Sequence, residues 1–591
     1  PRGDRLMIVT NGGGLGVLAA DALERGGGAL APLSAEAIGA LDKVLPAAWS
    51  RANPADILGD AHGDRYEAAV NILSREPCDA MLVMNCPTGV ADNNDAAEAV
   101  LRARAANADA PWLACWMGEA TAAAPRRQLE AARVPNYETP EEAVAAFLSL
   151  VEYARNQEAL LQTPTASAER TADARAVVRA IIEVALAEQR DTLTEPEAKR
   201  VLAAYGMPVV ETAIVATPEE AGAAAARFAR PVALKILSRQ ISHKTDVGGV
   251  RLNLEGADAV ETAAREMLTR VTASAPDARV DGFTVQPMVR RPRAQELILG
   301  AMEDGTFGPC LMFGQGGVAA EVVADSAMGL PPLNSVLARA MIDRTRVAKL
   351  LAGYRDRPPA DIDAVAAALV SLSDLIVDFP EIAELDVNPL LADETGVIAL
   401  DARIIVRPAA AAADARLAIR PYPAALARDI RVGAETMRLR PIRPQDAAQV
   451  LQLIERSDPR DVRLRFRDAA DAIDARASAR LSQIDYDREM AFVALEAEGA
   501  VAGVARLVFD PEFETAEYAV IVRSDVQGRG LGSQLLQALL DYAKSRGASR
   551  VWADVLSENA RMLELARGLN AALAPRADAP GLTRTAFTLE H

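Results

Sequence analysis

The chain has 591 residues, of which 50% are hydrophobic and 25% are charged, and its formal net charge is −18. This composition is that of a soluble globular protein, and the length predicts about three or four domains. The strong acidity argues against nucleic acid or a membrane surface as the main partner, so neither is expected.

Cysteine spacing and hydropathy bear on the compartment. Cys78, Cys86, Cys115 and Cys310 form no Cys-x-x-Cys pair, which favours a reducing, cytoplasmic setting. We find neither a signal peptide nor an apolar run of about 18 residues, so no membrane span is expected. The chain begins with Pro1, close to a predicted strand, and we interpret it as a fragment of a longer protein.

Short apolar runs alternate with helical stretches over the first part of the chain. Strands are predicted at 6–10, 80–85 and 112–116, and helices at 64–74 and 96–105. This alternation is typical of a doubly wound α/β domain, which we place at 1–160. The Gly13–Gly16 turn after the first strand either holds a phosphate or merely turns the chain, and His62 is expected at the surface.

The middle region, 174–407, resumes the alternation after a polar boundary at 163–173. Lys235 lies in a predicted strand, and the loop after it carries His243 and Lys244, followed by a pair of glycines, Gly248 and Gly249. Basic, Gly-rich hairpins cover phosphates well. This segment therefore predicts a site for nucleotide phosphates.

Two further motifs follow in the same region. Glu296 precedes a second Gly-rich loop, which contains Gly314 and Gly316. Later in the region, acidic and amide side chains offer oxygen ligands that suit Mg²⁺, at Asp386, Asn388 and Asp401.

Together these motifs resemble the ATP-grasp domain of ADP-forming acyl-CoA synthetases, over about 174–407. The resemblance implies that His243 carries a transient phosphate and that Lys235 and Glu296 contact ATP. It implies that Asn388 and Asp401 hold Mg²⁺. It also implies that the loop residues line the ATP site, namely Lys244, Gly248, Gly249, Gly314 and Gly316. Whether the region transfers phosphate or is a degenerate regulatory domain stays open.

The first 155 residues resemble the flavodoxin-like, succinyl-CoA-synthetase-type domain in the CoA-ligase region of the same synthetases. The segments 10–21, 53–61 and 114–119 carry this match. In that family a CoA-binding Rossmann domain and another phosphorylated His lie upstream, and this chain starts too late to contain them. We therefore expect that the chain alone does not complete a relay through two phosphohistidines.

An Ala- and Pro-rich stretch, 408–434, is predicted to be a linker to a last domain at 435–591. In that domain the pattern predicts a strand, two helices, several strands, a helix, a strand and a helix. A strand at 516–522 and a helix from Leu531 enclose the segment Gln527–Gly532, which reads QGRGLG.

The Gln527–Gly532 segment has the features of an anion site. Gly528, Gly530 and Gly532 permit positive φ and leave the backbone N–H groups uncovered. These N–H groups, the positive end of the following helix and the charge of Arg529 all favour a negative ligand. We expect this ligand to carry a pyrophosphate.

This segment resembles the Q/R-x-x-G-x-G/A turn of the GNAT acyltransferases, which grips the pyrophosphate of coenzyme A. The resemblance covers about 437–589. It implies an α/β GNAT domain that binds acetyl-CoA through the turn residues Gln527, Gly528, Arg529, Gly530, Leu531 and Gly532. It also implies that strand residues Val520 and Val522 orient the acyl carbonyl and the pantetheine.

Acyl transfer to an amine needs a group that accepts the amine proton, because a free lysine has a pKa of about 10.4. The resemblance to protein lysine acetyltransferases places this base at Glu517, and the alternative is an exposed strand carboxylate. Asp554 and Glu558 are less favoured bases. Asn559 either contacts the pantetheine or caps a helix. The Tyr that many GNAT enzymes use as general acid is missing after 556, so solvent is left to protonate the thiolate.

The order of the parts, a synthetase-like region followed by a GNAT domain, resembles the bacterial Pat-type protein lysine acetyltransferases. It implies an acetyl-CoA-dependent enzyme that acetylates lysine side chains of protein partners such as acyl-CoA synthetases. One alternative is a bifunctional enzyme that also has ADP-forming acyl-CoA ligase activity. Another is a ligand sensor joined to a GNAT-fold binding module. A homo-oligomer is left open.

Overall fold

The computed structural model describes residues 1, 3–107, 111–164, 172–241, 244–317, 324–355, 357–409, 416–467 and 473–589. The chain forms two compact units, Pro1–Leu160 and Leu161–His591. Among the residues described, no helix combines the length and the apolarity needed to traverse a bilayer.

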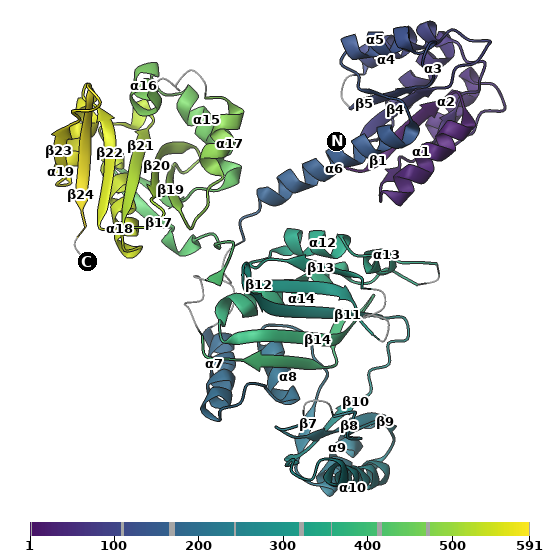
Figure 1. Ribbon diagram of the computed structural model, residues 1–591, viewed down its shortest axis with the longest axis vertical. Helices are drawn as coiled ribbons and strands as arrows, with labels where there is room; N and C mark the ends of the chain where they lie inside the picture. Colours follow the sequence, from purple (N-terminus) through teal and green to yellow (C-terminus); the bar gives the residue numbers. More distant parts are fainter. Residues whose placement is uncertain are drawn as a thin grey trace. The chain divides into compact units, whose positions relative to one another are not determined.

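The first unit is a parallel sheet with helices on both faces (Figure 1). The strand order is β2-β1-β4-β5-β6, with β3 paired to β1. The strands are β1 (Arg5–Thr10), β2 (Ala29–Leu30), β3 (Ala55–Asp56), β4 (Ala80–Asn85), β5 (Trp112–Trp116) and β6 (Asn136–Tyr137). The helices are α1 (Gly13–Arg25), α2 (Ala35–Val44), α3 (Gly63–Leu73), α4 (Asn93–Ala106), α5 (Ala123–Ala131) and α6 (Pro140–Leu160).

Successive residues of the central strands enter two different cores. Leu6 and Ile8 of β1 pack with α1 and α6, whereas Met7 and Val9 face the core formed with α2 to α5. Both faces of β1, β4 and β5 are buried, which is why these strands are continuous apolar runs in the sequence. The predicted strands and helices of this unit are confirmed within a few residues at their ends.

The Gly13–Gly16 segment is not a separate turn, which corrects the sequence interpretation. It forms the first turn of α1, and Gly12 is the N-cap. A Cβ on Gly13 would lie 2.9 Å from Asp56 Oδ2, and one on Gly16 would lie 3.1 Å from the Pro54 side chain. Close approach of the helix to the neighbouring strand therefore accounts for these glycines. His62 is exposed, as predicted, directly before α3.

The second unit begins with two antiparallel sheets. The smaller has the order β7-β10-β8-β9, and the larger has the order β13-β12-β11-β14-β15 with β16 on β14. The strands are β7 (Ala213–Val215), β8 (Val232–Leu237), β9 (Val250–Leu254), β10 (Gly282–Pro287), β11 (Gln295–Asp304), β12 (Gly308–Gln315), β13 (Ser326–Gly329), β14 (Ile382–Asp393), β15 (Gly396–Ala399) and β16 (Ala402–Val406). The helices are α7 (Ala172–Ala187), α8 (Glu195–Ala204), α9 (Pro218–Phe228), α10 (Ala257–Ser274), α12 (Ser335–Asp343), α13 (Val347–Leu351) and α14 (Ile362–Asp378).

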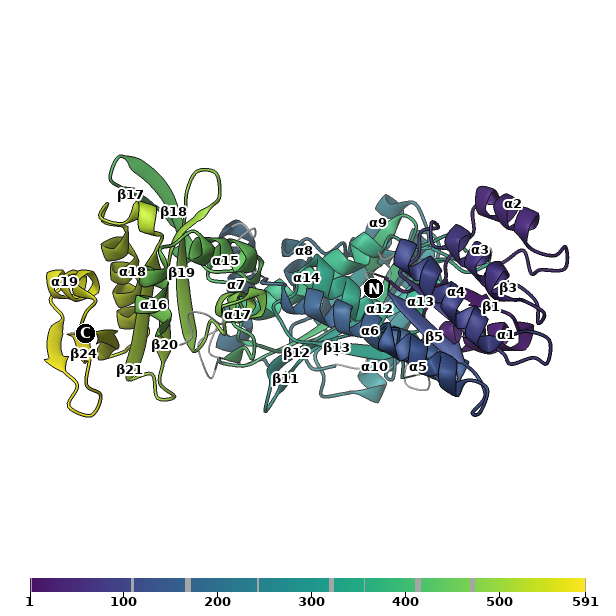
Figure 2. The ribbon, with the colours of Figure 1, turned by 90° about the horizontal axis from the view of Figure 1, so that it is seen from above.

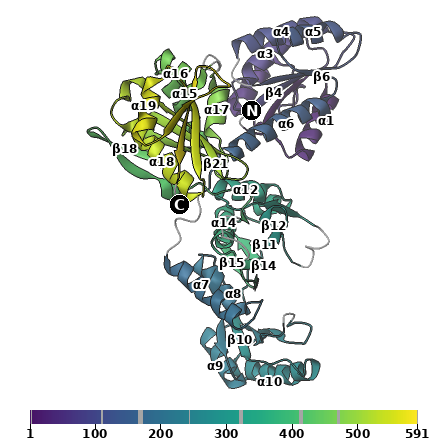
Figure 3. The same cartoon turned by 60° about the vertical axis from the view of Figure 1, so that its left-hand side comes forward.

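Each of these sheets has its own core. On the smaller sheet, α9 and α10 lie side by side and pack against β8 and β10 (Figure 3). On the larger sheet, α14 is buried along most of its length against β11 and β14 (Figure 2). The helix α8 belongs to the larger core, because Val201 and Leu202 are buried there. We call the two bodies the smaller lobe and the larger lobe.

The C-terminal part is a mixed sheet with the order β17-β18-β19-β20-β21-β22-β24-β23. Its strands are β17 (Arg428–Val432), β18 (Glu435–Pro441), β19 (Glu489–Leu495), β20 (Val501–Phe509), β21 (Thr515–Val522), β22 (Arg550–Leu556), β23 (Ala572–Pro575) and β24 (Leu582–Thr588). Its helices are α15 (Ala447–Glu455), α16 (Pro459–Phe466), α17 (Ala475–Ser482), α18 (Leu531–Ser545) and α19 (Ala560–Gly568).

Three features of this part differ from the pattern expected from the sequence. The strand β17 lies inside the range predicted to be a linker and pairs with β18. The helix α17 was not expected, because it buries serines, Ser478 and Ser482, in place of an apolar stripe. The strands β23 and β24 follow α19, and β24 pairs with β22.

Candidate functional site

The predicted anion-binding turn lies between β21 and α18, as expected from the sequence. Gly528 and Gly530 have φ of +77° and +89°, and Gly530 is the N-cap of α18. A Cβ at either glycine would meet open space. In the described residues, the N–H groups of 528–530 have no protein acceptor. The turn thus combines free donors, the N-terminus of a helix and room for a ligand, which fits an anion such as a pyrophosphate.

The side chains of the turn serve different purposes. The Gln527 amide donates to Val522 O over 3.0 Å and to Asp461 Oδ2 over 2.9 Å, so it fixes the turn against β21 and α16. Arg529 is half exposed and is 3.5 Å from Glu435, a loose pair that leaves its charge available. A Cβ on Gly532 would lie 2.7 Å from Leu565 Cδ1, so this glycine permits α18 to approach α19.

The strands β21 and β22 separate beside the turn. They pair in parallel at three register positions, which end with Glu517 opposite Trp552. On its other side, β21 stays paired with β20 as far as Val522. Among the described residues, one backbone edge of β21 is therefore unpaired from Tyr518 onward, and an extended ligand with amide groups can pair there as a strand would. Val520 and Val522 face the core under α18 and are partly buried.

Among the three predicted base candidates, only Glu517 is without an ion pair in the described part of the chain. Its side chain is exposed on β21. The Asp554 carboxylate accepts from Arg584 and Arg576 over 2.6–2.8 Å, and these hydrogen bonds, from Arg584 above all, hold the pKa of Asp554 below its ordinary value. Glu558 is paired with Arg463.

Asn559 caps a helix, which is one of the two roles that the sequence leaves open for it. Its side-chain oxygen accepts from the backbone N–H of Met562 over 3.2 Å, at the start of α19.

A small cavity lies beside Glu517 and was not predicted from the sequence. Glu517, Ala519 and Ile521 share one face of β21, and the last two line the cavity. Its walls are apolar residues of α15, β19 and β20, together with Arg465, Phe466 and Arg506. Burial lowers the pKa of Arg465 to about 10, and the neighbouring Glu517 carboxylate counteracts this shift. The sequence does not distinguish Arg465 as a cavity residue, because arginines are frequent in α16.

Two of the predicted nucleotide-binding residues, Lys235 and Lys244, lie close together. Lys235 of β8 is buried, and its Nζ is 2.8 Å from Glu195 Oε1 and 3.2 Å from Asp401 Oδ2. Lys244 Nζ is 2.8 Å from Glu195 Oε2. The cationic groups are thus gathered as a polyphosphate would require. Glu195 was not predicted, because the sequence gives it only the features of a helix start.

The two Gly loops serve backbone packing. Gly249 N–H donates to Lys244 O over 2.7 Å and Gly248 has a φ of +68°, so this pair closes the turn after Lys244. A Cβ on Gly314 would lie 2.4 Å from Asp325 O and one on Gly316 would lie 2.8 Å from the Leu297 backbone. Glu296 is exposed, and its carbonyl accepts from Gly316 N–H.

The predicted Mg²⁺ residues are neighbours across two strands. The pairing of β14 with β16 ends at Val387 and Ala402, and the next residues along the two strands are Asn388 and Asp401. Burial and the nearby Asp401 raise the pKa of Asp386. In the residues that the structure describes, no three His, Cys, Asp or Glu side chains form a metal-binding group. Asn388 and Asp401 therefore fit a cation that also takes oxygens from a bound phosphate. His243 lies outside the described residues.

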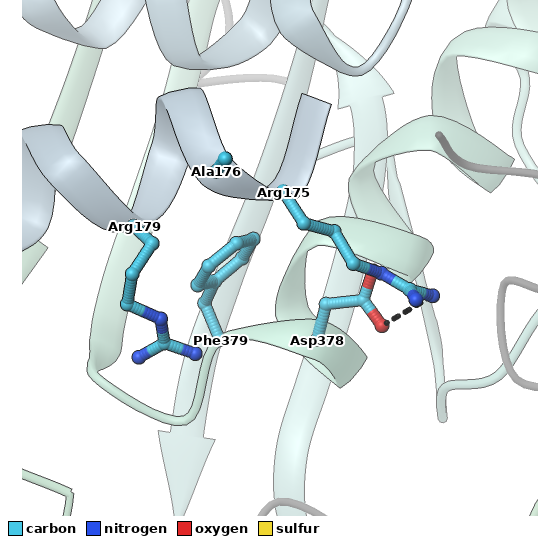
Figure 4. Close-up of a pocket in the computed structure, with 5 residues that line it drawn as sticks. All are labelled: Arg175, Ala176, Arg179, Asp378 and Phe379. Atoms are coloured by element: carbon cyan, nitrogen blue, oxygen red, sulfur yellow. Dashed lines mark hydrogen bonds and ion pairs between the residues drawn. The ribbon is translucent and has the colours of Figure 1, made fainter. Parts of the chain in front are cut away.

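Another pocket contains none of the predicted residues. It is lined by Arg175, Ala176 and Arg179 of α7 and by Asp378 and Phe379 at the end of α14 (Figure 4). Arg175 Nε is 3.0 Å from Asp378 Oδ2, and the Arg179 guanidinium lies over the Phe379 ring. These contacts attach α7 to the larger lobe.

Comparison with known proteins identifies the family to which the chain belongs. Residues 184–406 match the ATP-grasp domain family, and residues 457–570 match the acetyltransferase (GNAT) family. The chain is 38% identical over 231 residues to the beta subunit of acetate–CoA ligase [ADP-forming] I of Pyrococcus furiosus, which covers 39% of the chain and 98% of that subunit. The chain belongs to the ADP-forming acetate–CoA ligase family.

A longer match supports the same family. Acetate–CoA ligase [ADP-forming] I of Archaeoglobus fulgidus is 37% identical over 404 residues, which is 68% of the chain. The chain spans 57% of that ligase. A solved structure of the dinucleotide-forming acetyl-coenzyme A synthetase 1 of Ca. Korarchaeum cryptofilum, in complex with coenzyme A and a nucleotide analogue, is 39% identical and has a TM-score of 0.37. It covers 39% of the chain and is itself 99% covered.

These findings confirm the predicted fold class, an α/β multidomain protein with an ATP-grasp domain and a C-terminal GNAT domain. They also agree with the expected cofactors. GNAT domains use acetyl-CoA, and the ATP-grasp domains of this ligase family use ATP with Mg²⁺.

Proposed function

We propose that this chain forms part of a bifunctional enzyme. One part is an ADP-forming acyl-CoA ligase, and the other is a GNAT N-acyltransferase that uses acyl-CoA. The observation that carries the proposal is the 404-residue match to an ADP-forming ligase, which is longer than the ATP-grasp region 184–406 and therefore extends beyond it. The lysines around Glu195, of which Lys199 and Lys235 are buried, support it, because a degenerate nucleotide site has no need to keep buried cations.

In the ligase part, Lys235, Lys244 and Glu296 contact ATP, and Asn388 and Asp401 hold Mg²⁺. The Gly248–Gly249 turn and the loop with Gly314 and Gly316 shape the backbone around the nucleotide. His243 accepts and passes on the phosphoryl group. ATP and Mg²⁺ supply the phosphoryl chemistry, and the chain's residues place and neutralise its charges.

In the acyltransferase part, the N–H groups of 528–532 bind the coenzyme A pyrophosphate, and Arg529 adds a positive charge. The open edge of β21 beside Val520 and Val522 orients the pantetheine and the acyl carbonyl. Glu517 accepts the proton of the amine, directly or through a water, because the amine must be neutral to attack. The thiol has an ordinary pKa of about 8.5, so the thiolate leaves without a dedicated acid.

The second candidate is the Pat-type function, acetylation of protein lysines with the ligase-like region as a regulator. It is favoured by the exposure of Glu517, which a long side chain of a protein partner can reach. Acyl-CoA synthetases are the proposed targets. A cytoplasmic location goes with both candidates and agrees with the four free cysteines.

One pair of experiments separates the candidates. Full-length protein is given ATP, CoA and acetate, and ADP release is measured with and without His243→Ala. Separately, an acyl-CoA synthetase is incubated with acetyl-CoA and the protein, and lysine acetylation is measured by mass spectrometry with and without Glu517→Ala. ADP release that depends on His243 supports the bifunctional enzyme. Acetylation that depends on Glu517, without any ADP release, supports the Pat-type function and contradicts the ligase.

A further inference from the structure

Glu195 is a carboxylate inside the protein that nothing in the family resemblance assigns. It is the first residue of α8 and is 5% exposed. A buried carboxylate is costly unless cations and hydrogen bonds satisfy it. Here three ammonium groups surround it, with Lys199 at 2.9 Å and Lys235 at 2.8 Å from Oε1, and Lys244 at 2.8 Å from Oε2.

An ammonium group has three N–H donors, and the three lysines differ in how many of these donate to the protein. Lys199 donates all three, to Glu195, Gln286 and Thr212, over 2.9, 2.6 and 3.3 Å. Lys235 donates two, to Glu195 and Asp401. Lys244 donates one, to Glu195. Within the described residues, Lys199 thus donates all three of its N–H groups to the protein, whereas Lys235 and Lys244 together have three N–H groups without a protein acceptor, which a ligand can accept.

The cluster carries a net positive charge. Three lysines and two carboxylates, Glu195 and Asp401, sum to one positive charge. Burial by itself would raise the pKa of Glu195, but the attraction of Lys235, Lys199 and Lys244 lowers it far below the ordinary value. Glu195 thus stays ionised, and the cluster as a whole attracts an anion.

The cluster joins the two lobes. Glu195 and Asp401 belong to the larger lobe, where the segment before α8 bonds to β16 through Leu193 N–H and Ile404 O, 2.9 Å apart. Lys235 and Gln286 lie on neighbouring strands of the smaller lobe. Charged groups of each lobe therefore pair with those of the other. The position of the smaller lobe's ammonium groups is set by their contact with Glu195.

We propose that Glu195 is the positioning residue of the nucleotide phosphate site. It holds Lys235 and Lys244 so that their free N–H donors face the phosphates, and Lys199 anchors Glu195 from behind. The inference rests on the proposed nucleotide site in the ATP-grasp domain. It goes beyond that site because Glu195 and Lys199 themselves touch no phosphate.

The test compares binding of MgADP and of AMP to the full chain by calorimetry. Glu195→Gln keeps the shape of the side chain and removes its charge. We expect it to weaken MgADP at least tenfold and to change AMP less than twofold, because only the terminal phosphate depends on the two lysines. The control is Glu188→Gln, an exposed carboxylate of the same lobe that pairs with Arg190 and Arg239, and it should change neither affinity.

Some outcomes overturn the inference alone. These are MgADP affinity within twofold of wild type in Glu195→Gln, or an equal loss for MgADP and AMP, which would indicate general damage to the lobe. If the wild-type chain itself binds no MgADP, the proposed nucleotide site fails and the inference fails with it.

A measurement on the wild type keeps the inference testable if Glu195→Gln does not fold. Amine-reactive labelling, read by mass spectrometry, compares Lys244 with Lys43, an exposed lysine of the first unit. We expect Lys244 to label at least tenfold more slowly, and MgADP but not AMP to slow Lys235 and Lys244 further. Labelling of Lys244 as fast as Lys43 would show that Glu195 does not hold it, and would overturn the inference.

Discussion

Glu517 of β21 lies opposite Trp552 of β22 at the last position where these two parallel strands pair. The carboxylate therefore stands where the strands begin to separate, beside the edge on which the acyl group is proposed to lie. We expect Glu517→Gln to lower the rate of acetyl transfer by about 100-fold or more, because the amine proton loses its acceptor. Acetyl-CoA affinity should stay unchanged in calorimetry.

The control for this change is Glu514→Gln, an exposed carboxylate just before β21. It should keep the wild-type rate. A Glu517→Gln enzyme that retains full activity would show that the base lies elsewhere.

The Gly528–Gly530 turn should tolerate no acidic side chain. Gly530→Glu places a negative charge at the helix N-terminus and strains a residue with φ of +89°, and we expect it to abolish coenzyme A binding. Gly547→Glu is the matched control, since Gly547 has φ of +85° and equally open surroundings at the other end of α18. Calorimetry should show loss of binding in the first variant and normal binding in the second. Equal behaviour of the two variants would rule out the turn as the pyrophosphate site.

We expect the effect of Mg²⁺ on nucleotide affinity to depend on Asp401. In the wild type we expect ADP to bind more tightly with Mg²⁺ than with a chelator, and Asp401→Asn should remove most of this gain because it removes a charged oxygen ligand. Asp363→Asn, at an exposed carboxylate in the first turn of α14, should keep the gain. A gain that persists in Asp401→Asn would exclude this residue as a metal ligand.

Asp554 should stabilise the GNAT domain in a pH-dependent way. Its carboxylate accepts three short hydrogen bonds from Arg584 and Arg576 and is mostly buried, so Asp554→Asn should lower the free energy of unfolding by about 1–2 kcal/mol at pH 7. The folded-state pKa is lowered. The stabilisation is therefore complete above the ordinary pKa of about 3.9 and is lost as the pH falls through the lowered value.

Denaturant unfolding at several pH values checks this prediction. The difference between wild type and Asp554→Asn should be constant near neutral pH and should narrow below a pH of about 4. Asp578→Asn, at the exposed partner of Arg576, should leave stability unchanged. A difference that does not vary with pH would assign the effect to packing.

Much of the architecture was predictable because its signals are local. The buried strands β1, β4 and β5 of the first unit contain runs of four or five apolar residues, and both sides of such a strand are covered, so its partner elements do not have to be known. The helix α17 was missed for the opposite reason. Its buried side chains are serines, which become core residues only because other elements lie over them.

The same division holds for the sites, and it separates what the sequence determined from what the tertiary structure decided. By itself the sequence determined the turn between β21 and α18, because the positive φ of Gly528 and Gly530 and the start of a helix depend on neighbouring residues. Only the tertiary structure decided that Asp554 is paired with Arg576 and Arg584, whereas Glu517 has no ion pair in the part of the chain that the structure describes. It also placed Glu195 against Lys235 and Lys244, which are 40 and 49 residues away in the chain. Such partners are chosen when separate elements pack together, and the free energy of pairing buried charges depends on that packing, which no short stretch of sequence contains.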